Sequence, residues 1–552
     1  MLAAASSMTI PRRALGLLVL ALGSLGSPAL AQEERFPAAA RAAAEGITAE
    51  RLARDVEFLA SDELLGRNTP SPGFDRAAAT IAERLAAAGL TPLGDDGTYF
   101  QHYDLREEGI DTTAAGIEIA GRRFRFGEDF VFRSFAGPLS GTYPVVYVGH
   151  GWTVPGQGID PYEGLDVRGK IVLAHGPLAM PKGVAIRQIG RIYPGAGTPF
   201  AEAQQRGAAG ILFVARSEAL GDWERMRGTT RRLEIEPSVP SAYAAIPVTS
   251  IVLAPQVTEA LFEGERVGGA EMIARGDSAD YPASFELARP VTVHVPVATS
   301  ALHRPYNVVA LLEGSDPARK NEYVTIASHL DGAVGTAVVE GDSIYNAADD
   351  NASGSAGNLA MAEQMTKAPR PARSIVFIWD SGEERGLWGT RRFVHDPPVP
   401  LESIVAHVNI DMIGANRAPG SRDSVSELVT ESDEVYLTGP GVLSAAVDSL
   451  LVRTNREAFG LRFRRDRDRP DHEAFYPRTD AGPFLERGVL TIGFHTGLHD
   501  RYHRPADEAR YLDPKKMETV ARAIFASVWA LANAAETPRI DKEIPAIVPR
   551  YP

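Results

Sequence analysis

The spacing of hydrophobic residues changes twice along this chain. From residue 48 to about residue 90, apolar side chains such as Leu52, Val56 and Leu59 recur at near-helical intervals. This spacing predicts two amphipathic helices joined by a loop at 70–73, and Gly89 ends the second of them. Strand-like stretches follow, at 98–105 and 116–126.

Between about residues 135 and 290 the pattern is one of short β runs separated by turns rich in glycine and proline. A single helix is expected near 200–207, and metal-binding residue types do not cluster in this stretch. The pattern favours an inserted, mainly β domain at 135–290. The expected strands lie at 143–148, 170–174, 209–214 and 248–253.

From about residue 291 to residue 534 strands alternate with helices. The strand-like runs are nearly continuously apolar, which is typical of parallel strands buried on both faces. They lie at 323–327, 374–379, 404–410 and 490–494, with helices expected at 354–365 and 517–534. The fold class predicted is therefore α/β, a three-layer α/β/α domain formed by 32–134 and 291–540, with a C-terminal tail at 541–552.

The composition is that of a folded, acidic protein. Of the 552 residues 44% are hydrophobic and 23% charged, and the formal net charge of -14 makes nucleic-acid binding an unfavourable hypothesis. The chain contains no cysteine, which excludes disulfides and thiolate metal ligands. The length favours more than one domain and leaves the oligomeric state open.

The first 31 residues have the pattern of an export signal. Arg12 and Arg13 precede an apolar run, and the small-x-small pattern Ala29-Leu30-Ala31 predicts cleavage after Ala31. The run is shorter than the ~20 residues that a membrane span needs. We therefore expect a periplasmic or secreted bacterial protein with no membrane segment after cleavage, and the arginine pair leaves Sec and twin-arginine export both open.

Polar motifs follow several of the predicted strands. In open α/β sheets the carboxyl ends of the strands meet at one edge, so their loops can build a shared site. Histidine, aspartate and glutamate without sulfur suit two divalent cations such as zinc. The motifs are Ser328-His329-Leu330-Asp331, Asp349-Asp350-Asn351-Ala352-Ser353-Gly354, Ser381-Gly382-Glu383-Glu384, Asn409-Ile410-Asp411-Met412 and Asp500-Arg501-Tyr502-His503.

Each motif also has a structural interpretation when it is taken alone. Asp350 or Asn351 could cap the helix that follows, although a carboxylate there could also bridge two cations. Adjacent glutamates such as Glu383 and Glu384 are usually solvated, yet in extended chain one could bind metal while the other faces water. The five motifs together favour a two-metal centre.

Three further interpretations concern histidine and tyrosine. The spacing of His329 and Asp331 predicts that the carboxylate accepts a hydrogen bond from the imidazole. His495, His499 and His503 are all possible as the last ligand, and Tyr502 could either donate to an oxyanion or pack. Other hydrolase and nucleotide-binding motifs, namely G-x-S-x-G, H-E-x-x-H, the Walker loop and G-x-G-x-x-G, are absent from the sequence.

From about residue 48 to residue 534 the chain resembles the di-zinc exopeptidases, a family that includes bacterial leucyl aminopeptidases and glutamate carboxypeptidase. The segments at 58–63 and 66–67 resemble the N-terminal part of that family. The stretches at 162–172 and 206–210 are similar to a protease-associated (PA) domain.

The resemblance implies two zinc ions per chain. His329 and Asp411 would hold one ion, Glu384 and His503 the other, and Asp350 would bridge them.

The resemblance also implies roles for other residues. Glu383 would be the general base, Asp331 the acid that orients a ligand, and Tyr502 the group that stabilises the tetrahedral intermediate. The Tyr-His-x-Pro-x-Asp setting at 502–507 selects His503 as the last ligand. The chain departs from many relatives at Ala481, where a larger side chain is common, and this departure concerns specificity.

The function predicted is an exported zinc aminopeptidase acting on peptides. One alternative is a carboxypeptidase for acidic or modified peptides, with the arginines of 462–469 as its candidate carboxylate pocket, although acids interspersed there favour a solvated loop. The other alternative is a receptor-like protein without activity.

Overall fold

The computed structural model describes residues 36–548 except 177–178, 186–194, 216–219, 221–222, 237–247, 333–334, 336–337, 418–427 and 472–474. The predicted signal peptide and the end of the predicted tail lie outside the described residues. Within the described part, no helix is both long and apolar enough to cross a membrane.

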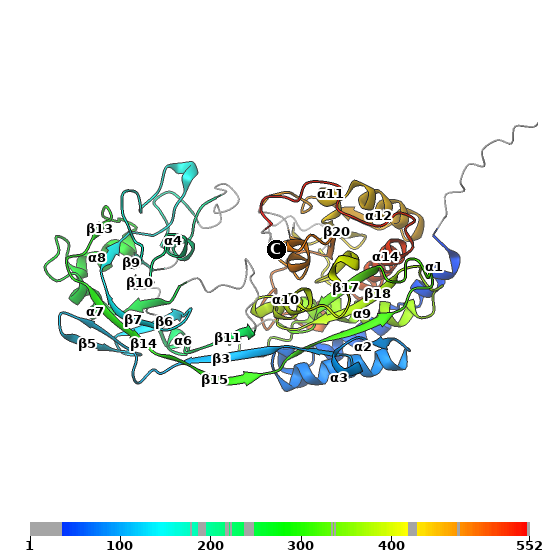
Figure 1. Cartoon of the computed structure of the whole chain (residues 1–552), viewed down its shortest axis with the longest axis horizontal. Coiled ribbons are helices and arrows are strands. Elements are labelled where there is room, and N and C mark those ends of the chain that lie inside the picture. Colours follow the sequence, from blue (N-terminus) through cyan, green and yellow to red (C-terminus); the bar gives the residue numbers. More distant parts are fainter. Residues whose placement is uncertain are drawn as a thin grey trace, which may run out of the picture.

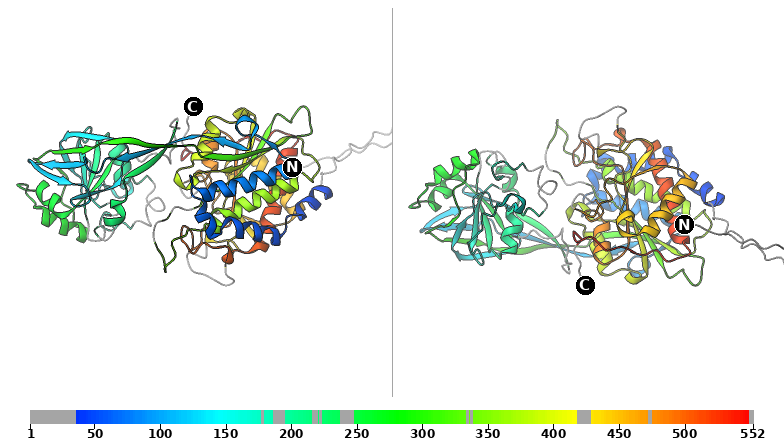
Figure 2. Two further views of the ribbon diagram at one scale, coloured as in Figure 1. Left: turned by 90° about the horizontal axis from the view of Figure 1, so that it is seen from below. Right: turned by 90° about the horizontal axis from the view of Figure 1, so that it is seen from above.

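The chain forms two lobes joined by a narrow three-stranded ribbon, as Figures 1 and 2 show. The ribbon strands are antiparallel and lie in the order β11-β3-β15. They are β3 (Asp104–Ile110), β11 (Arg231–Glu236) and β15 (Val297–His303).

The larger lobe contains a nine-stranded mixed sheet. Its central strands β18, β17, β19 and β22 are parallel, and β16 and β20 flank them in antiparallel pairing. The four parallel strands coincide with the four apolar runs, which confirms that prediction. In sheet order the strands are β1 (Thr91–Pro92), β16 (Tyr306–Leu312), β18 (Ser374–Asp380), β17 (Tyr323–His329), β19 (Ile404–Ile410), β22 (Thr491–His495), β20 (Glu434–Thr438) and β21 (Arg462–Arg464), with β2 (Phe100–His102) paired to β16.

Helices cover both faces of this sheet. On one face α9 and α14 pack with the N-terminal helices against side chains such as Ile326 and Val408. On the other face α10 and α13 contribute Phe393 and Phe484. The predicted three-layer α/β class is thereby confirmed. The helices of this lobe are α1 (Ala38–Glu45), α2 (Ala49–Leu59), α3 (Pro72–Ala87), α9 (Gly354–Met365), α10 (Trp388–His395), α11 (Pro440–Leu443), α12 (Ala445–Ala458), α13 (Ala481–Glu486) and α14 (Pro514–Asn533).

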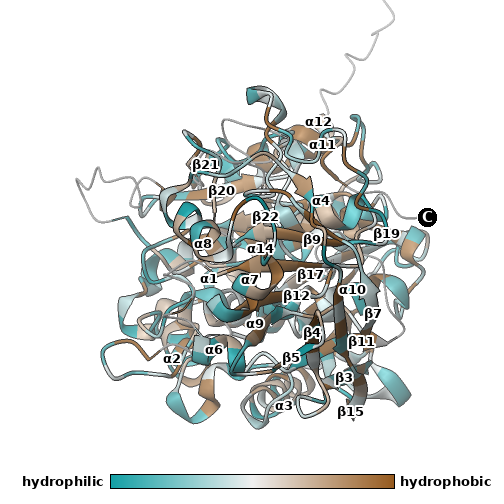
Figure 3. Cartoon of the chain, turned by 90° about the vertical axis from the view of Figure 1, so that its left-hand side faces the viewer, coloured by the Kyte–Doolittle hydropathy of each residue, from teal (hydrophilic) through white to brown (hydrophobic). Residues whose placement is uncertain are grey.

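The smaller lobe is mainly β and has its own hydrophobic core. Its six-stranded sheet has the order β13-β8-β9-β10-β12-β6, and β5-β4-β14-β7 form a second sheet. Several strands of both lobes contain hydrophobic segments, drawn in brown in Figure 3, for example β9, β12 and β17. The strands here are β4 (Gly116–Ile119), β5 (Arg122–Arg125), β6 (Phe130–Ser134), β7 (Leu139–Tyr143), β8 (Val145–Tyr147), β9 (Ile171–His175), β10 (Gly210–Val214), β12 (Ser250–Leu253), β13 (Phe285–Glu286) and β14 (Val291–Val295).

The expectation of a single helix in this stretch is wrong. Besides α4 (Pro199–Gln205), the smaller lobe contains α6 (Trp223–Arg227), α7 (Pro255–Leu261) and α8 (Gly269–Ser278). Helix α8 begins with glycine and contains Gly276, and glycine disfavours helix in isolation. Packing of the fully buried Met272 against the core stabilises it instead, and sequence periodicity does not reveal that contribution.

Candidate active site

The polar motifs converge at the carboxyl ends of the parallel strands. His329 is the last residue of β17, and Asp411 directly follows β19. Glu383 and Glu384 lie in the 3-10 turn η6 (Glu383–Arg385), which begins three residues after the end of β18. Neighbouring strands thus carry these side chains to one edge of the sheet.

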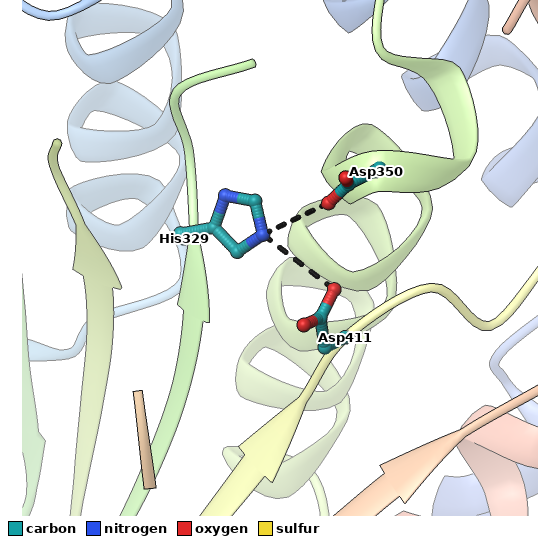
Figure 4. A group of neighbouring side chains, drawn as sticks. All are labelled: His329, Asp350 and Asp411. Atoms are coloured by element: carbon teal, nitrogen blue, oxygen red, sulfur yellow. Dashed lines mark ion pairs between the residues drawn. The ribbon is translucent and has the colours of Figure 1, made fainter. Parts of the chain in front are cut away.

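His329 faces two carboxylates (Figure 4). Its Nε2 lies 3.2 Å from Asp350 Oδ1 and 3.5 Å from Asp411 Oδ1. On the other side of the ring, Nδ1 lies 3.0 Å from the main-chain carbonyl of Asp331. A carbonyl can only accept, so Nδ1 carries the proton in the neutral imidazole and Nε2 presents a lone pair to the carboxylates.

A second group shares the carboxylate of Asp350. His503 Nε2 lies 3.1 Å from Asp350 Oδ2 and 3.1 Å from Glu384 Oε2. One oxygen of Asp350 therefore faces each histidine, which is the arrangement of a bridging ligand.

These two groups fit divalent cations. In each, the potential ligand atoms lie within 4.8 Å of one another. His329 Nε2, Glu384 Oε1 and Asp411 Oδ1 are buried and have no hydrogen-bond partner among the residues that the structure describes. Lone pairs that face one another inside a protein are costly unless a cation or a proton lies among them. Imidazole nitrogen and carboxylate oxygen, without thiolate, suit zinc.

The acid–base properties of these groups reflect crowding of buried carboxyls. Burial and the nearby Asp350 raise the pKa of Glu384 to about 8. Burial would by itself raise the pKa of Asp350, but contacts with His329 and His503 hold it below the usual range. Burial also raises the pKa of Glu383 well above its ordinary value, and Glu384 adds to this effect. Cations placed among these groups would favour their ionised forms.

The residue after Asp350, and not Asp350 itself, makes the side-chain contact at the start of α9. Asn351 Oδ1 accepts hydrogen bonds from the N–H of Gly354, the first residue of α9, and from that of Met412. Its amide nitrogen donates to the carbonyl of Ile410. Asn351 thus stabilises the start of the helix, and the carboxylate of Asp350 faces the two histidines.

The predicted contact between Asp331 and His329 needs correction. The Asp331 carboxylate is 3.9 Å from the imidazole Nδ1, beyond hydrogen-bond range, and the main-chain carbonyl of Asp331 is the acceptor. The carboxylate instead accepts hydrogen bonds from the N–H groups of Glu383 and Glu384, at 3.1 and 3.3 Å. Asp331 therefore orients the imidazole through its backbone and the glutamate turn through its side chain.

The glutamates also differ from the extended geometry that was expected. They lie in a tight turn between Gly382 and Gly386, which both have positive φ. The turn still separates their roles, because Glu384 contacts His503 whereas Glu383 lines the adjacent cavity.

The three candidate histidines have different surroundings. Only His503 lies in a potential metal group of the described residues. His499 pairs with Asp349 at 3.3 Å, and His495 stacks on Tyr436. The Tyr502 ring stacks on His503 at 3.7 Å, and burial and nearby carboxylates raise the pKa of its hydroxyl, so Tyr502 is a hydrogen-bond donor at neutral pH.

Three supporting residues were not assigned roles from the sequence. The Asp507 carboxylate accepts from the N–H groups of Asp349 and Asp350. Asp349 in turn accepts from the N–H groups of Gly414 and Ala415. Two features of the sequence could have indicated these roles. They are the adjacent acids at 349–350 and the acid that ends the 502–507 motif.

The third supporting residue is Arg67, which is completely buried. Its guanidinium donates to the carbonyls of Leu330, Asn346 and Ala347, which lie in the loops carrying His329 and Asp350. Arg67 also donates to the nearby carbonyl of Leu59. Its other main-chain acceptors lie far away in sequence, so the local pattern gives no sign of its role.

A cavity of about 90 Å³ adjoins the site and is lined by Asp350, Glu383, Asp411 and Tyr502. Apolar side chains form part of its wall, including those of Met412, Phe475, Phe494 and Leu498. The cavity could therefore accept an apolar group next to the metal ligands.

The arginines proposed for a carboxylate pocket are paired with acids of their own neighbourhood. Arg462 contacts Asp433 at 2.8 Å, and Arg464 contacts Asp466 at 2.8 Å. Arg465 and Arg469 pair in the same way with Asp468 and Asp471. Ala481 is buried and is not among the residues that line the cavity.

Fold and site together define a three-layer α/β domain with two adjacent potential metal groups and an inserted, mainly β lobe. Residues 307–528, which carry all the proposed ligands, match the model for Peptidase family M28. This match agrees with the family that the resemblance implied.

Two curated relatives match the chain over part of its length. An aminopeptidase of Pseudomonas aeruginosa (strain UCBPP-PA14) is 33% identical over 193 residues, which are 35% of this chain and 31% of the relative. Leupeptin-inactivating enzyme 1 of Streptomyces exfoliatus is 30% identical over 262 residues, 47% of this chain and 51% of the relative. The chain thus spans about a third to a half of these relatives.

A solved structure matches almost the whole chain. The aminopeptidase from Aneurinibacillus sp. strain AM-1 superposes with a TM-score of 0.51 and 17% identity, covering 93% of this chain and 100% of that chain. The match shows that the two chains share a fold.

Proposed function

We propose that this protein is an exported, metal-dependent aminopeptidase that removes N-terminal residues from peptides. The observation that carries the proposal is the carboxylate of Asp350, which faces His329 with one oxygen and His503 with the other. The family match and the names of the curated relatives support the same activity.

In this proposal His329 and Asp411 hold one zinc ion, Glu384 and His503 hold the other, and Asp350 bridges them. When bound, two zinc ions supply Lewis acidity, which polarises a peptide carbonyl and lowers the pKa of water. The apolar wall beside the ligands would receive the side chain of the N-terminal residue.

Glu383 is the proposed general base. Its carboxyl lines the cavity beside the ligands, so it can take a proton from the attacking water and pass it to the leaving amine. Asp331 fixes the turn that carries Glu383 through the N–H groups of that turn. Tyr502, which lines the same cavity, donates a hydrogen bond to the oxygen that becomes negative during attack.

The inserted lobe is proposed to be a PA-like domain, and the first 31 residues are proposed to direct export to the periplasm or outside the cell.

Two alternatives to the aminopeptidase activity remain as outcomes of the test. A carboxypeptidase needs a cationic pocket, and the arginines of 462–469 described above are paired. A receptor-like protein does not need a complete set of metal ligands. In this chain all the proposed ligands lie in two adjacent potential metal groups, which supports an enzyme.

The test is hydrolysis of leucine p-nitroanilide by the purified mature chain before and after chelation, with zinc then added back. We expect activity that the chelator removes and zinc restores. Lack of hydrolysis by a zinc-loaded chain would contradict the proposal, and N-blocked peptides would then test the carboxypeptidase alternative. A chain that neither binds zinc nor hydrolyses would favour the receptor-like alternative.

A further inference from the structure

The ribbon that carries the smaller lobe packs against the larger lobe through a small apolar cluster. We call its three ribbon-side residues the ribbon root: Tyr103, which precedes β3, Leu105 in β3 and Ile235 in β11. Leu105 and Ile235 are directly paired across the two strands and fully buried. Their partner on the larger lobe is Trp388, the first residue of α10. Helix α10 lies beside the end of β11 in Figure 1.

Trp388 lies directly against the turn that carries Glu383. The main-chain N–H of Trp388 donates to the carbonyl of Gly382 at 3.1 Å. Its indole is so close to Gly382 that an added Cβ would lie 2.5 Å from Cε3, and Gly382 also has a φ of 69°. The indole therefore packs against Gly382 with no room for a side chain there, so Trp388 contacts the residue before Glu383 directly.

The ribbon root also makes a polar contact with this segment. The Tyr103 hydroxyl lies 2.9 Å from Ser381 Oγ, and both groups are buried. Ser381 is fixed further by Asn307 Oδ1, which accepts from its N–H at 3.2 Å. Ser381 and Gly382 are thus contacted by Tyr103 and Trp388, while Asp331 holds the glutamate N–H groups from the metal side.

We propose that the ribbon root is a positioning element for Glu383, so that the inserted lobe contributes to turnover through Trp388 and Ser381. The inference rests on the proposed role of Glu383 as general base. A base must lie within hydrogen-bond reach of the proton that it removes, and small misplacements of catalytic groups are costly in rate. Removing contacts at the ribbon root should therefore lower kcat, while substrate binding and zinc, which use other residues, change little.

The test compares two isoleucine-to-alanine variants, one at each end of the ribbon. Ile235→Ala opens a gap beside Trp388, whereas Ile110→Ala, the matched control, opens a gap at the far end of β3 in the core of the smaller lobe. We expect Ile235→Ala to lower kcat about tenfold with KM and zinc content unchanged. Ile110→Ala should keep the kcat of the wild type. Unchanged kcat in Ile235→Ala, or an equal fall in both variants, would overturn the inference.

Two more variants separate positioning from a general loss of stability. Ile235→Val keeps most of the packing and should restore most of the lost kcat. Tyr103→Phe keeps the ring but removes the contact with Ser381, so kcat should fall by a smaller factor than in Ile235→Ala. A kcat of Ile235→Val as low as that of Ile235→Ala would contradict the proposed packing role.

A readout that does not depend on activity is amide hydrogen exchange of the Glu383–Arg385 turn. Ile235→Ala should speed exchange there, and Ile110→Ala should not. This result would stand even if the chain failed to hydrolyse aminopeptidase substrates, so a failure of the proposed function can be told apart from a failure of this inference. Equal exchange in both variants and the wild type would refute it.

Discussion

Each lobe contains a mixed sheet with four parallel strands, but the lobes differ in what these strands carry at their carboxyl ends. In the larger lobe these ends carry His329, Glu383, Glu384 and Asp411. In the smaller lobe β8, β9, β10 and β12 are parallel as well, yet His175 at the end of β9 is buried against the Tyr147 hydroxyl at 3.0 Å. Both potential metal groups of the described residues lie in the larger lobe. The sheet thus provides the place for a site, and the carboxylates decide whether one forms.

Among the substitutions that would remove this difference between the lobes, replacing the proposed general base should have the largest effect. Glu383→Gln keeps the shape of the side chain but removes its ability to take a proton, so kcat should fall by about 10²–10⁴-fold with zinc content unchanged. The control is Glu163→Gln, at an exposed acid of the smaller lobe, which should leave steady-state kinetics unaltered. Zinc loss in Glu383→Gln, measured by elemental analysis, would contradict the assignment.

The next largest effect should come from removing a proposed zinc ligand. His503→Ala removes the nitrogen that faces Asp350 and Glu384, so the chain should bind less zinc and lose activity. It should also lose the rise in melting temperature that zinc gives the wild type, because an ion that binds only the folded state stabilises it. His150→Ala, at a histidine just after β8, should keep full zinc content. Equal zinc content in the two variants would remove His503 from the ligand set.

A smaller effect is expected at Asp331. Asp331→Asn leaves the main-chain carbonyl that orients His329 but weakens the acceptor for the glutamate turn, so kcat should fall about 10–100-fold with little zinc lost. Measuring kcat, KM and bound zinc together checks this. If zinc were lost before activity fell, the side chain would act on the metal ligands instead of on the turn.

The smallest effects concern the separate stability of the lobes. Ile326→Val in β17 and Ile211→Val in β10 remove one buried methylene from each sheet, and each should cost about 0.5–1.5 kcal/mol. We expect calorimetry with and without zinc to show that Ile326→Val shifts the zinc-sensitive transition and Ile211→Val the other. A single transition shifted equally by both variants would show that the lobes unfold together.

The positions of the buried strands were predictable because each is a nearly continuous apolar run rich in β-branched and aromatic residues. The three-layer class followed from the alternation of these runs with helices, and the family resemblance rested on motifs at their ends. Helix α8 could not be predicted, since its stability comes from Met272 in a core formed by distant strands.

The site was predictable in its residue types and less so in its contacts. His329 and Asp350 belong to local motifs, and the structure brings them together. The Asp331 side chain contacts a turn about 50 residues away in sequence, and Arg67 contacts loops more than 260 residues away. Such contacts depend on the completed fold, so spacing in the sequence gives no sign of them.

The most direct test of the central claim is the number of zinc ions bound to the wild type and to Asp350→Asn. The account holds that one carboxylate bridges two metal positions. It predicts about two zinc ions per wild-type chain and a loss at both positions in the variant, which should retain fewer than one. Two tightly bound ions in Asp350→Asn, with the fold intact by circular dichroism, would contradict it.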